Sequence, residues 1–475
     1  MADNKPSQGA RQSLILKLIT PPPMARADDE GHVRKVLSYQ VEQYFYTQLA
    51  PQLPSSLPVA TCLATSISNH DHDGTATTAM ILSDLKTKYP VAGEKYHVLS
   101  SMQIHSALDW LAGFHGFWWS RWRDFDVSLL VQPPLEEARR NASEKTVWLN
   151  GGYTYLATRR KEYADLAAEE SEWSTTLTSP VEGLDQSVAE LVAQFLAPTA
   201  SGYSPTSPYQ TLIHGDVKSE NLFTSTSGDQ VAFYDFQYVG LGLGVCDLAK
   251  LFTCSVPLAM LVNDKSIPEE LQMQEGERAL LERYWLRLKH VGDRPYSWDT
   301  FVLHWEAALV DWLRFQASWG FWGNTEWLQA RGRSILKDPG WRNAVISATT
   351  SIVLDLLAKW LSIGHDILDQ ANNLTEYMLQ TLTQLGSKAV NRGRVSWRPG
   401  GNWYRRAANN TQAFNKTATS PLPDSVVAAS GTPMSSGAPI SSGAPSSGAP
   451  VSTAGAMSTV RIALLLAVAL ALVMS

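Results

Sequence analysis

The chain has 475 residues, of which 44% are hydrophobic and 18% are charged, so most of it can bury a core. Its net charge of -6 comes without a basic stripe, which argues against nucleic acid as a partner. The three cysteines, Cys62, Cys246 and Cys254, are too few for a disulfide framework and lack the paired spacing of a zinc site.

The first predicted element is a short strand. Residues 1–12 are polar, show no secretory signal, and are expected to be a disordered start. The apolar run at 13–19 then predicts a strand that carries Lys17. Two interpretations of this lysine stay open: a charge that protects an edge strand from aggregation, or a contact to the α and β phosphates of a nucleotide. Residues 37–46 predict a helix on which Glu42 can pair with Lys17, and this favours the phosphate contact.

Three features follow before the central part of the chain. Residues 71–73 read Asp-His-Asp and are interpreted as a solvated turn, not a metal site. Residues 78–85 predict a strand that leaves a small N-terminal lobe. After Ser100, apolar residues at helical spacing predict a helix, and His115 on that face is interpreted as a satisfied core histidine.

The next region combines irregular structure with helices. Residues 123–172 are mixed in character and predict short helices within irregular segments. Apolar residues between Leu184 and Phe195 predict an amphipathic helix that Pro198 ends. A polar loop rich in Ser, Pro and Tyr leads from this helix into the central motif.

The central motif runs from Thr211 to Phe252. It sets four polar residues into apolar flanks: His214, Asp216, Asn221 and Asp235. The apolar runs at 222–223 and 231–234 are separated by a polar turn, which is the signature of a β-hairpin. The hairpin would bring Asn221, before its first strand, close to Asp235, after its second.

This layout suits phosphoryl transfer, in which the protein orients a hydroxyl and holds Mg²⁺ against the phosphates. Magnesium prefers oxygen ligands, which Asp235 and Asn221 supply. Asp216 is placed to accept or orient the proton of an attacking hydroxyl. His214 and Gly215 are interpreted as residues that fix the shape of the loop.

The segments HGDVKSEN, YDFQ and GVCDLAKLF resemble the aminoglycoside phosphotransferase and choline kinase group. The resemblance is greatest to its choline-kinase-like and ecdysteroid-kinase-like branch, which has a similar S-Y-x-x-E-x-x-F-Y run around Glu42. It implies an α+β, bilobal protein-kinase-like fold that uses ATP and Mg²⁺. It also implies roles by position: Asp216 as catalytic base, Asn221 and Asp235 as metal ligands, Asp247 as a brace of the catalytic loop, and Lys17 with Glu42 at the nucleotide.

One part of the family pattern is missing. Kinase folds of this kind place a strand pair and a nucleotide-covering loop before the lysine strand, but only sixteen residues precede Lys17. The expected N-lobe therefore lacks its first hairpin. Three explanations stay open: a truncated start, an uncovered phosphate site, or a protein that does not catalyse. A pseudokinase or binding scaffold is thus the alternative function, and a membrane adaptor is a third.

The second half of the expected C-lobe is helical. Apolar residues from Phe301 to Trp319 step by three and four, which predicts a long buried helix started by the Ser297 cap. This stripe is interpreted as core, not as an aromatic binding cage. Residues 345–385 predict one or two more helices. The expected N-lobe then spans 13–85, and the C-lobe spans 86–386 with its catalytic loop at 212–237.

The end of the chain changes in composition. Residues 387–456 contain a repeated Ser-Gly-Ala-Pro unit and predict a flexible linker. In the hydrophobic tail at 457–475, thirteen uncharged residues follow Arg461, fewer than the roughly 20 that a membrane span needs. The tail is interpreted as a marginal anchor if Arg461 snorkels, or as a lipid-anchor signal cleaved near Ser447.

The predicted reaction moves the γ-phosphoryl group of ATP to a hydroxyl of a small molecule. Choline, ethanolamine, a sterol, a sugar and an antibiotic-like amine all stay open as acceptors. The expected location is cytoplasmic, with the C-terminal tail as a membrane tether. The alternative is a lipid-anchored surface protein whose N-terminus is incomplete in this sequence.

Overall fold

The structure is a computed structural model that describes residues 13–20, 29–69, 76–140, 144–198, 206–263 and 266–349. The expected linker and tail, the polar start, the Asp-His-Asp turn at 71–73 and most of the helical segment at 345–385 lie outside these residues. No helix among the described residues is both long and apolar enough to cross a membrane. All three cysteines are free thiols.

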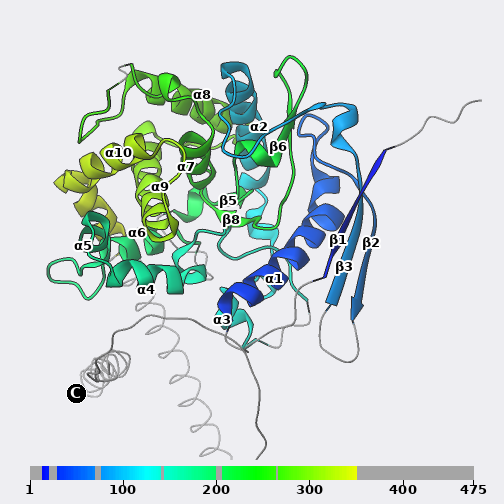
Figure 1. Cartoon of the computed structure of the whole chain (residues 1–475), viewed down its shortest axis with the longest axis horizontal. Coiled ribbons are helices and arrows are strands. Elements are labelled where there is room, and N and C mark those ends of the chain that lie inside the picture. The colour runs from blue at the N-terminus through cyan, green and yellow to red at the C-terminus, as the bar shows by residue number, and fades with distance from the viewer. Residues whose placement is uncertain are drawn as a thin grey trace, which may run out of the picture. The chain divides into compact units, whose positions relative to one another are not determined.

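The N-terminal lobe is a three-stranded antiparallel sheet with one helix beside it (Figure 1). The strands are β1 (Leu14–Ile19), β2 (Cys62–Asn69) and β3 (Ala76–Ser83), in the order β1-β3-β2. The register opposes Lys17 to Met80 across the β1 and β3 pair. The helix, α1 (Glu30–Tyr44), begins at the Asp29 cap and continues through a π-helical turn to Leu49. The expected strand and helix of this lobe are therefore present.

Two features of this lobe differ from the expectation. The strand expected at 78–85 lies at 76–83, because the Asp84 side chain accepts a hydrogen bond from the Lys86 backbone and starts a 3₁₀ turn over Leu85–Thr87. Strand β2 was not predicted. Its residues from Leu63 to Ser66 are all exposed, so it lacks the alternation of apolar and polar residues that marks a strand with one buried face.

The C-terminal lobe is mostly helical and contains two small sheets. Its helices are α2 (Ser101–Trp119), α3 (Pro134–Glu137), α4 (Arg160–Ala168), α5 (Glu172–Thr178), α6 (Val188–Leu196), α7 (Val245–Cys254), α8 (Glu275–Gly292), α9 (Trp298–Trp319) and α10 (Thr325–Lys337). One small antiparallel sheet has the order β4-β6-β7, formed by Val91–Ala92, Leu222–Thr224 and Val231–Phe233. The other pairs β5 (Thr211–Ile213) with β8 (Gly240–Gly242).

Capping residues explain where the helices of this lobe begin. Ser100 and Gln103 form a reciprocal capping box at the start of α2, and Ser297 caps α9 as expected. The helix expected from Leu184 begins instead at Val188, because Ser187 and Glu190 form the capping box there. In each case a side-chain oxygen satisfies a backbone N–H that the first turn of the helix leaves unpaired.

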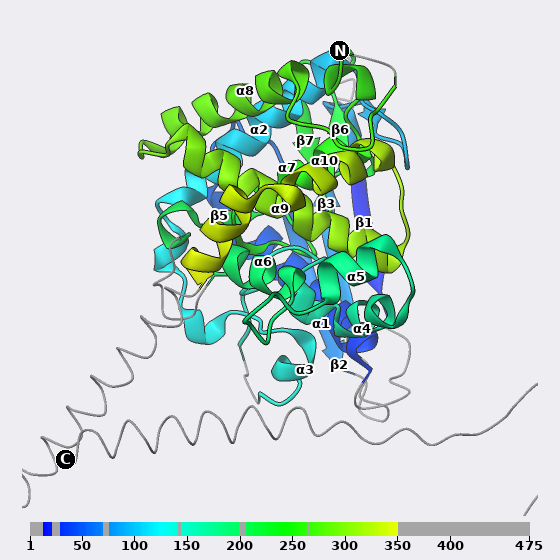
Figure 2. The same cartoon turned by 90° about the vertical axis from the view of Figure 1, so that its left-hand side faces the viewer.

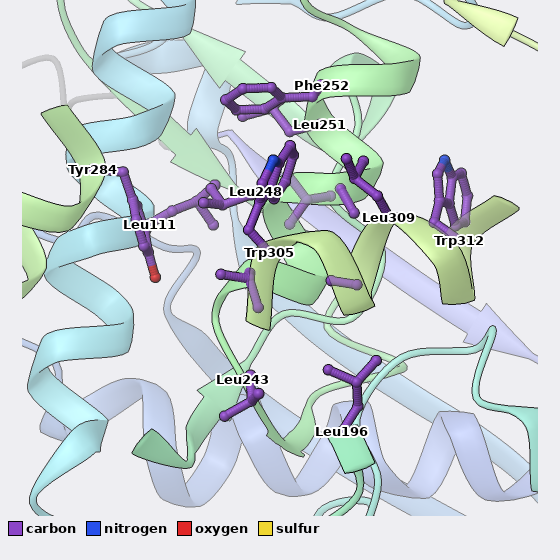
Figure 3. Packing of buried hydrophobic residues seen from close by; sticks show 14 of the residues in the cluster. Leu111, Leu196, Leu243, Leu248, Leu251, Phe252, Tyr284, Trp305, Leu309 and Trp312 are labelled. Carbon is purple, nitrogen blue, oxygen red and sulfur yellow. The ribbon is translucent and has the colours of Figure 1, made fainter. Parts of the chain in front are cut away.

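The core of this lobe forms around α9, which packs against α6, α7 and α10 (Figure 2). Trp305, Leu309 and Trp312 follow one face of α9 and are almost completely buried (Figure 3). Leu248 and Phe252 of α7 lie in the same cluster. The core interpretation of this stripe holds except at its end, because Trp319 is the last residue of α9 and is 56% exposed.

Candidate active site

The segment after β5 makes a tight turn that depends on a glycine. Gly215 has φ of +86°, and an added Cβ would lie 2.2 Å from the Tyr238 carbonyl oxygen and 2.8 Å from the Gly152 nitrogen. Only glycine avoids both the strained backbone and the clash. The turn carries the backbone from β5 directly into Asp216, which is 8% exposed. The buried Lys250 side chain donates a hydrogen bond to the Gly215 carbonyl and so stabilises the turn.

Asp247 is the centre of the support beneath this turn. Its carboxylate accepts hydrogen bonds from the backbone nitrogens of His214 at 2.8 Å and Gly215 at 2.9 Å. His115 Nε2 lies 3.1 Å from the same carboxylate, and its Nδ1 lies 2.7 Å from the Tyr284 hydroxyl. Complete burial alone would raise the pKa of Asp247, but the hydrogen bond and charge of His115 hold that pKa below its ordinary value. The carboxylate is therefore ionised and fixes the backbone of the loop.

His214 joins the loop to the end of the hairpin. Its Nδ1 accepts from the Asp216 backbone nitrogen at 3.2 Å, so its Nε2 carries the proton and donates to the Tyr234 carbonyl at 2.9 Å. Burial lowers the pKa of His214, which agrees with a neutral ring. The imidazole therefore holds Asp216 and the residue before Asp235 in a fixed relationship.

Asp216 and Asn221 meet within the loop. Asn221 Nδ2 donates to the Asp216 backbone carbonyl at 2.7 Å and to Asp216 Oδ2 at 2.9 Å. Both donor hydrogens of the carboxamide are thereby used, and no described residue donates to its oxygen. Lys218 Nζ lies 3.3 Å from Asp216 Oδ2 and 3.1 Å from Glu220 Oε1, and these carboxylates raise the pKa of Lys218 against the opposing effect of burial.

The two lobes meet at Lys17. Its ammonium donates to both oxygens of Glu42, at 2.8 and 2.6 Å, and to Asp235 Oδ1 at 2.9 Å. Glu42 is the residue with which the sequence predicts Lys17 to pair. Burial raises the pKa of Glu42 to about 7, whereas the pKa of Asp235 stays below its ordinary value because the Lys17 charge and hydrogen bond outweigh burial. Two carboxylates thus share one ammonium.

A cleft of about 630 Å³ opens around this contact. Its lining includes Ile15, Leu16 and Lys17 of β1, and Phe223, Tyr234 and Asp235 of the hairpin. Residues 82–86, at the end of β3 and just after it, also line the cleft. The volume lies in the range of small-molecule and cofactor sites.

A second cavity, of about 200 Å³, is lined in part by residues 218–220 of the catalytic loop. Lys218 and Glu220 form its edge nearest to Asp216, and the rings of Tyr96, Tyr153 and Trp319 are among its lining residues. The end of the α9 stripe is thus not core but part of a pocket wall. This corrects the sequence interpretation at Trp319, whose position as the last residue of the helix leaves one side of the ring uncovered.

Asp235, which lines the cleft, and Asn221 of the catalytic loop offer oxygen ligands of the kind that magnesium binds. Within the described parts of the chain, Asp235 Oδ2 and the Asn221 side-chain oxygen accept no hydrogen bond, so both can act as ligands. Magnesium binds through one or two protein oxygens together with phosphates and water, so two such groups suffice. The described residues contain no cluster of three or more His, Cys, Asp and Glu side chains that could hold a metal ion.

The structure brings the sequence-predicted residues together in two linked groups. Lys17, Glu42 and Asp235 form one. The other contains Asp216 and Asn221 with their supports, His214 and Asp247. Sequence reasoning did not identify three further residues of the site, which are Lys218, Gln237 and Lys250. The position of Lys218, two residues after Asp216 in the motif, is a signal that could have found it.

The chain is similar to several known proteins. The model of the ecdysteroid kinase-like family matches residues 2–266. Similar solved structures include a choline kinase from Streptococcus pneumoniae, with 12% identity over 72% of this chain and 87% of that chain and a TM-score of 0.31. A choline kinase from Cryptosporidium parvum Iowa II has 13% identity over 68% and 79%, with a TM-score of 0.32.

An aminoglycoside-3'-phosphotransferase of type VIII is also similar, with 16% identity over 63% of this chain and 85% of that chain and a TM-score of 0.30. No curated protein matches the sequence. The expected α+β fold, with a small N-terminal lobe built on an antiparallel sheet and a mostly helical C-terminal lobe, is confirmed. Because the family model covers more than half of the 475 residues, the chain belongs to the ecdysteroid kinase-like family.

Proposed function

We propose that this protein transfers the γ-phosphoryl group of ATP to a hydroxyl of a small molecule, with magnesium as cofactor. The observation that carries the proposal is the contact between Lys17 of the N-terminal lobe and Asp235 of the C-terminal lobe, in the wall of the 630 Å³ cleft. A cation for phosphates and a carboxylate for a metal lie together there. This pair of groups is what a nucleotide triphosphate and its metal require.

The nucleotide would occupy this cleft. Its phosphates would meet Lys17, which Glu42 positions, and its base would lie against the connection at 82–86. Asp235 and Asn221 would hold the magnesium ion, which neutralises charge on the phosphates when it is bound. The free oxygens of these two side chains support this assignment.

Asp216 would act on the acceptor. Its Oδ2 is held by Asn221 and Lys218, so its Oδ1 remains to accept a hydrogen bond from the acceptor hydroxyl. As the new bond between the hydroxyl oxygen and phosphorus forms, the bond to the β-phosphate oxygen breaks and the hydroxyl proton passes to Asp216. Lys218 keeps the carboxylate oriented and supplies positive charge next to the transferred group.

The acceptor would enter through the 200 Å³ pocket beside Lys218. The rings of Tyr153 and Trp319 in its wall already lie against the Arg159 guanidinium, at 4.9 and 5.2 Å from the ring centroids. An aromatic face that already binds a cation is less available for a second one. The aromatic wall therefore offers apolar contact and does not by itself favour a quaternary amine.

We extend the proposal to the parts of the chain beyond the site. The N-lobe is assigned to 13–85 and the C-lobe to 86–386, with residues 457–475 as a membrane tether of a cytoplasmic enzyme. Cell fractionation of the full chain tests the tether. Recovery in the membrane fraction is expected, and a wholly soluble full-length protein would contradict it.

Transfer of labelled phosphate tests the function. The full chain is incubated with γ-labelled ATP, magnesium and a panel containing choline, ethanolamine, a sterol, a sugar and an aminoglycoside. Label should appear in one class of alcohol, and Asp216→Asn should reduce that rate by about 10²- to 10⁴-fold. Transfer at the wild-type rate by Asp216→Asn would contradict the role of Asp216. Magnesium-dependent ATP binding without transfer to any alcohol would favour the binding-scaffold alternative.

A further inference from the structure

Asp235 has an unusual backbone conformation, and side chains of other residues hold its carboxylate. Its φ is +66°, in the left-handed region that residues other than glycine seldom adopt. The next residue, Phe236, is fully buried and stacks on Phe45 with the ring centroids 3.7 Å apart. The backbone on the C-terminal side of Asp235 is therefore anchored, and what remains to be fixed is the rotation of the carboxylate.

Two donors hold one oxygen of that carboxylate. Gln237 Nε2 lies 2.6 Å from Asp235 Oδ1, and Lys17 Nζ lies 2.9 Å from the same atom. The described residues place no donor on Oδ2. Because both donors hold Oδ1, Oδ2 is the oxygen of this carboxylate that a ligand could use.

The orientation of the Gln237 amide follows from its surroundings. A carboxylate oxygen at 2.6 Å requires a donor, so the nitrogen faces Asp235 and the oxygen faces Ser38 Oγ of α1, 3.3 Å away. The Ser38 hydroxyl also lies 2.8 Å from the Lys35 carbonyl, so its contact with Gln237 is the weaker of the two. The Gln237 backbone carbonyl accepts from Trp148 Nε1 at 2.9 Å, which fixes the residue independently of α1.

Lys17 and Gln237 have different roles in the proposed function. If Lys17 donates to the phosphates of a bound nucleotide, its ammonium has fewer hydrogens left to hold Asp235. Gln237 has no such second task, and its neutral amide adds no charge that would compete with a metal. Of the described side chains, it is then the one donor left on Oδ1.

We infer that Gln237 is a positioning residue that orients the Asp235 carboxylate toward magnesium. The inference rests on the proposed function, because it presumes a nucleotide and a metal in the cleft. It predicts a specific defect. Loss of the Gln237 amide should weaken the use of magnesium while leaving the nucleotide contacts intact.

The test measures ATP binding by the full chain over a range of magnesium concentrations. Gln237→Met keeps the volume of the side chain but removes the donor. A lost hydrogen bond to a charged group should raise the magnesium concentration for half-maximal ATP binding by about 10-fold. At saturating magnesium, the ATP affinity should stay within about threefold of wild type. The exposed Gln272→Met is the matched control and should not move the magnesium dependence.

Gln237→Asn gives a second variant if the methionine variant does not fold. It keeps an amide but shortens the side chain by one methylene, so the donor no longer reaches Oδ1, and the same shift is expected. An unchanged magnesium dependence in a folded variant, with a wild type that needs magnesium, would overturn the inference alone. A wild type that binds ATP without magnesium, or not at all, would overturn the proposed function and the inference with it.

Discussion

Lys17 Nζ lies 2.9 Å from Asp235 Oδ1, although 218 positions separate the two residues in the sequence. The contact links the central region of β1 to the end of the hairpin, and Glu42 of α1 completes it. One ammonium thus neutralises two carboxylates at the boundary between the lobes. Its removal should affect ligand binding and folding together.

Replacement of Lys17 by methionine tests this double role. We expect a fall in ATP affinity of about 10- to 100-fold, the effect of losing a hydrogen bond between charged groups. We also expect a lower melting temperature, because Glu42 is buried and would lose its counter-charge. Calorimetric titration and thermal unfolding measure the two effects. Lys35→Met, at an exposed position of α1, is the control and should change neither.

Asp247→Asn tests the support beneath the catalytic loop. The substitution keeps the shape of the side chain but replaces a carboxylate that accepts from two backbone N–H groups and His115. The free energy of unfolding should fall by about 3 kcal/mol, because donors buried under the loop lose a charged acceptor. Denaturant unfolding gives this value. Asp293→Asn, at an exposed left-handed residue where asparagine is well tolerated, should be nearly neutral.

Alanine substitutions at two glycines with similar backbone angles distinguish the cost of backbone strain from the cost of a steric clash at the turn before Asp216. Gly215 has φ of +86° and Gly183 has φ of +80°, but a Cβ at Gly183 would meet no atom within 4 Å. Gly183→Ala should therefore cost only the left-handed strain, about 1 kcal/mol. Gly215→Ala should cost a further 1 to 3 kcal/mol, because its Cβ would clash with the Tyr238 carbonyl. Equal losses of stability in the two variants would show that the clash is relieved.

The pH dependence of stability should carry a contribution from His304. Burial lowers the pKa of this histidine to about 3, whereas the ordinary value is about 6.5. Between these values the unfolded chain binds a proton that the folded protein does not, so stability falls as the pH is lowered from 6.5 toward 3. The slope is about 1.4 kcal/mol per pH unit for one group.

His304→Asn removes this titration and should flatten the loss of stability between pH 6 and pH 4 relative to wild type. Urea unfolding at several pH values measures the difference. His290→Gln, at an exposed position of α8, should leave the slope unchanged. A slope in His304→Asn as steep as in wild type would show that the ring is protonated in the folded protein.

The sequence predicts those parts of the site whose geometry is local. The hairpin and the turn at Gly215 lie within some twenty consecutive residues, so turn chemistry and spacing specify them. The pairing of Lys17 with Glu42 could also be predicted, because a strand followed by a helix limits how the two side chains can meet. These contacts need little information from the rest of the chain.

The remaining features depend on residues that are distant in the sequence. Whether Gln237 donates to Asp235 depends on Phe236 stacking and on the Trp148 contact, neither of which leaves a pattern in the sequence. Trp319 continues the helical spacing of the α9 stripe, and only the end of the helix makes it a pocket wall. Strand β2 was missed because both its faces are exposed near Leu63.

The central claim is that the cleft beside Lys17 binds ATP through magnesium. The most direct measurement is ATP binding by the full wild-type chain and by Asp235→Asn, each with magnesium and with magnesium removed by a chelator. We expect wild type to bind ATP more tightly with magnesium, and Asp235→Asn to lose that gain while keeping its melting temperature within a few degrees. Equal ATP affinity with and without magnesium in wild type, or an unchanged magnesium effect in Asp235→Asn, would contradict the account.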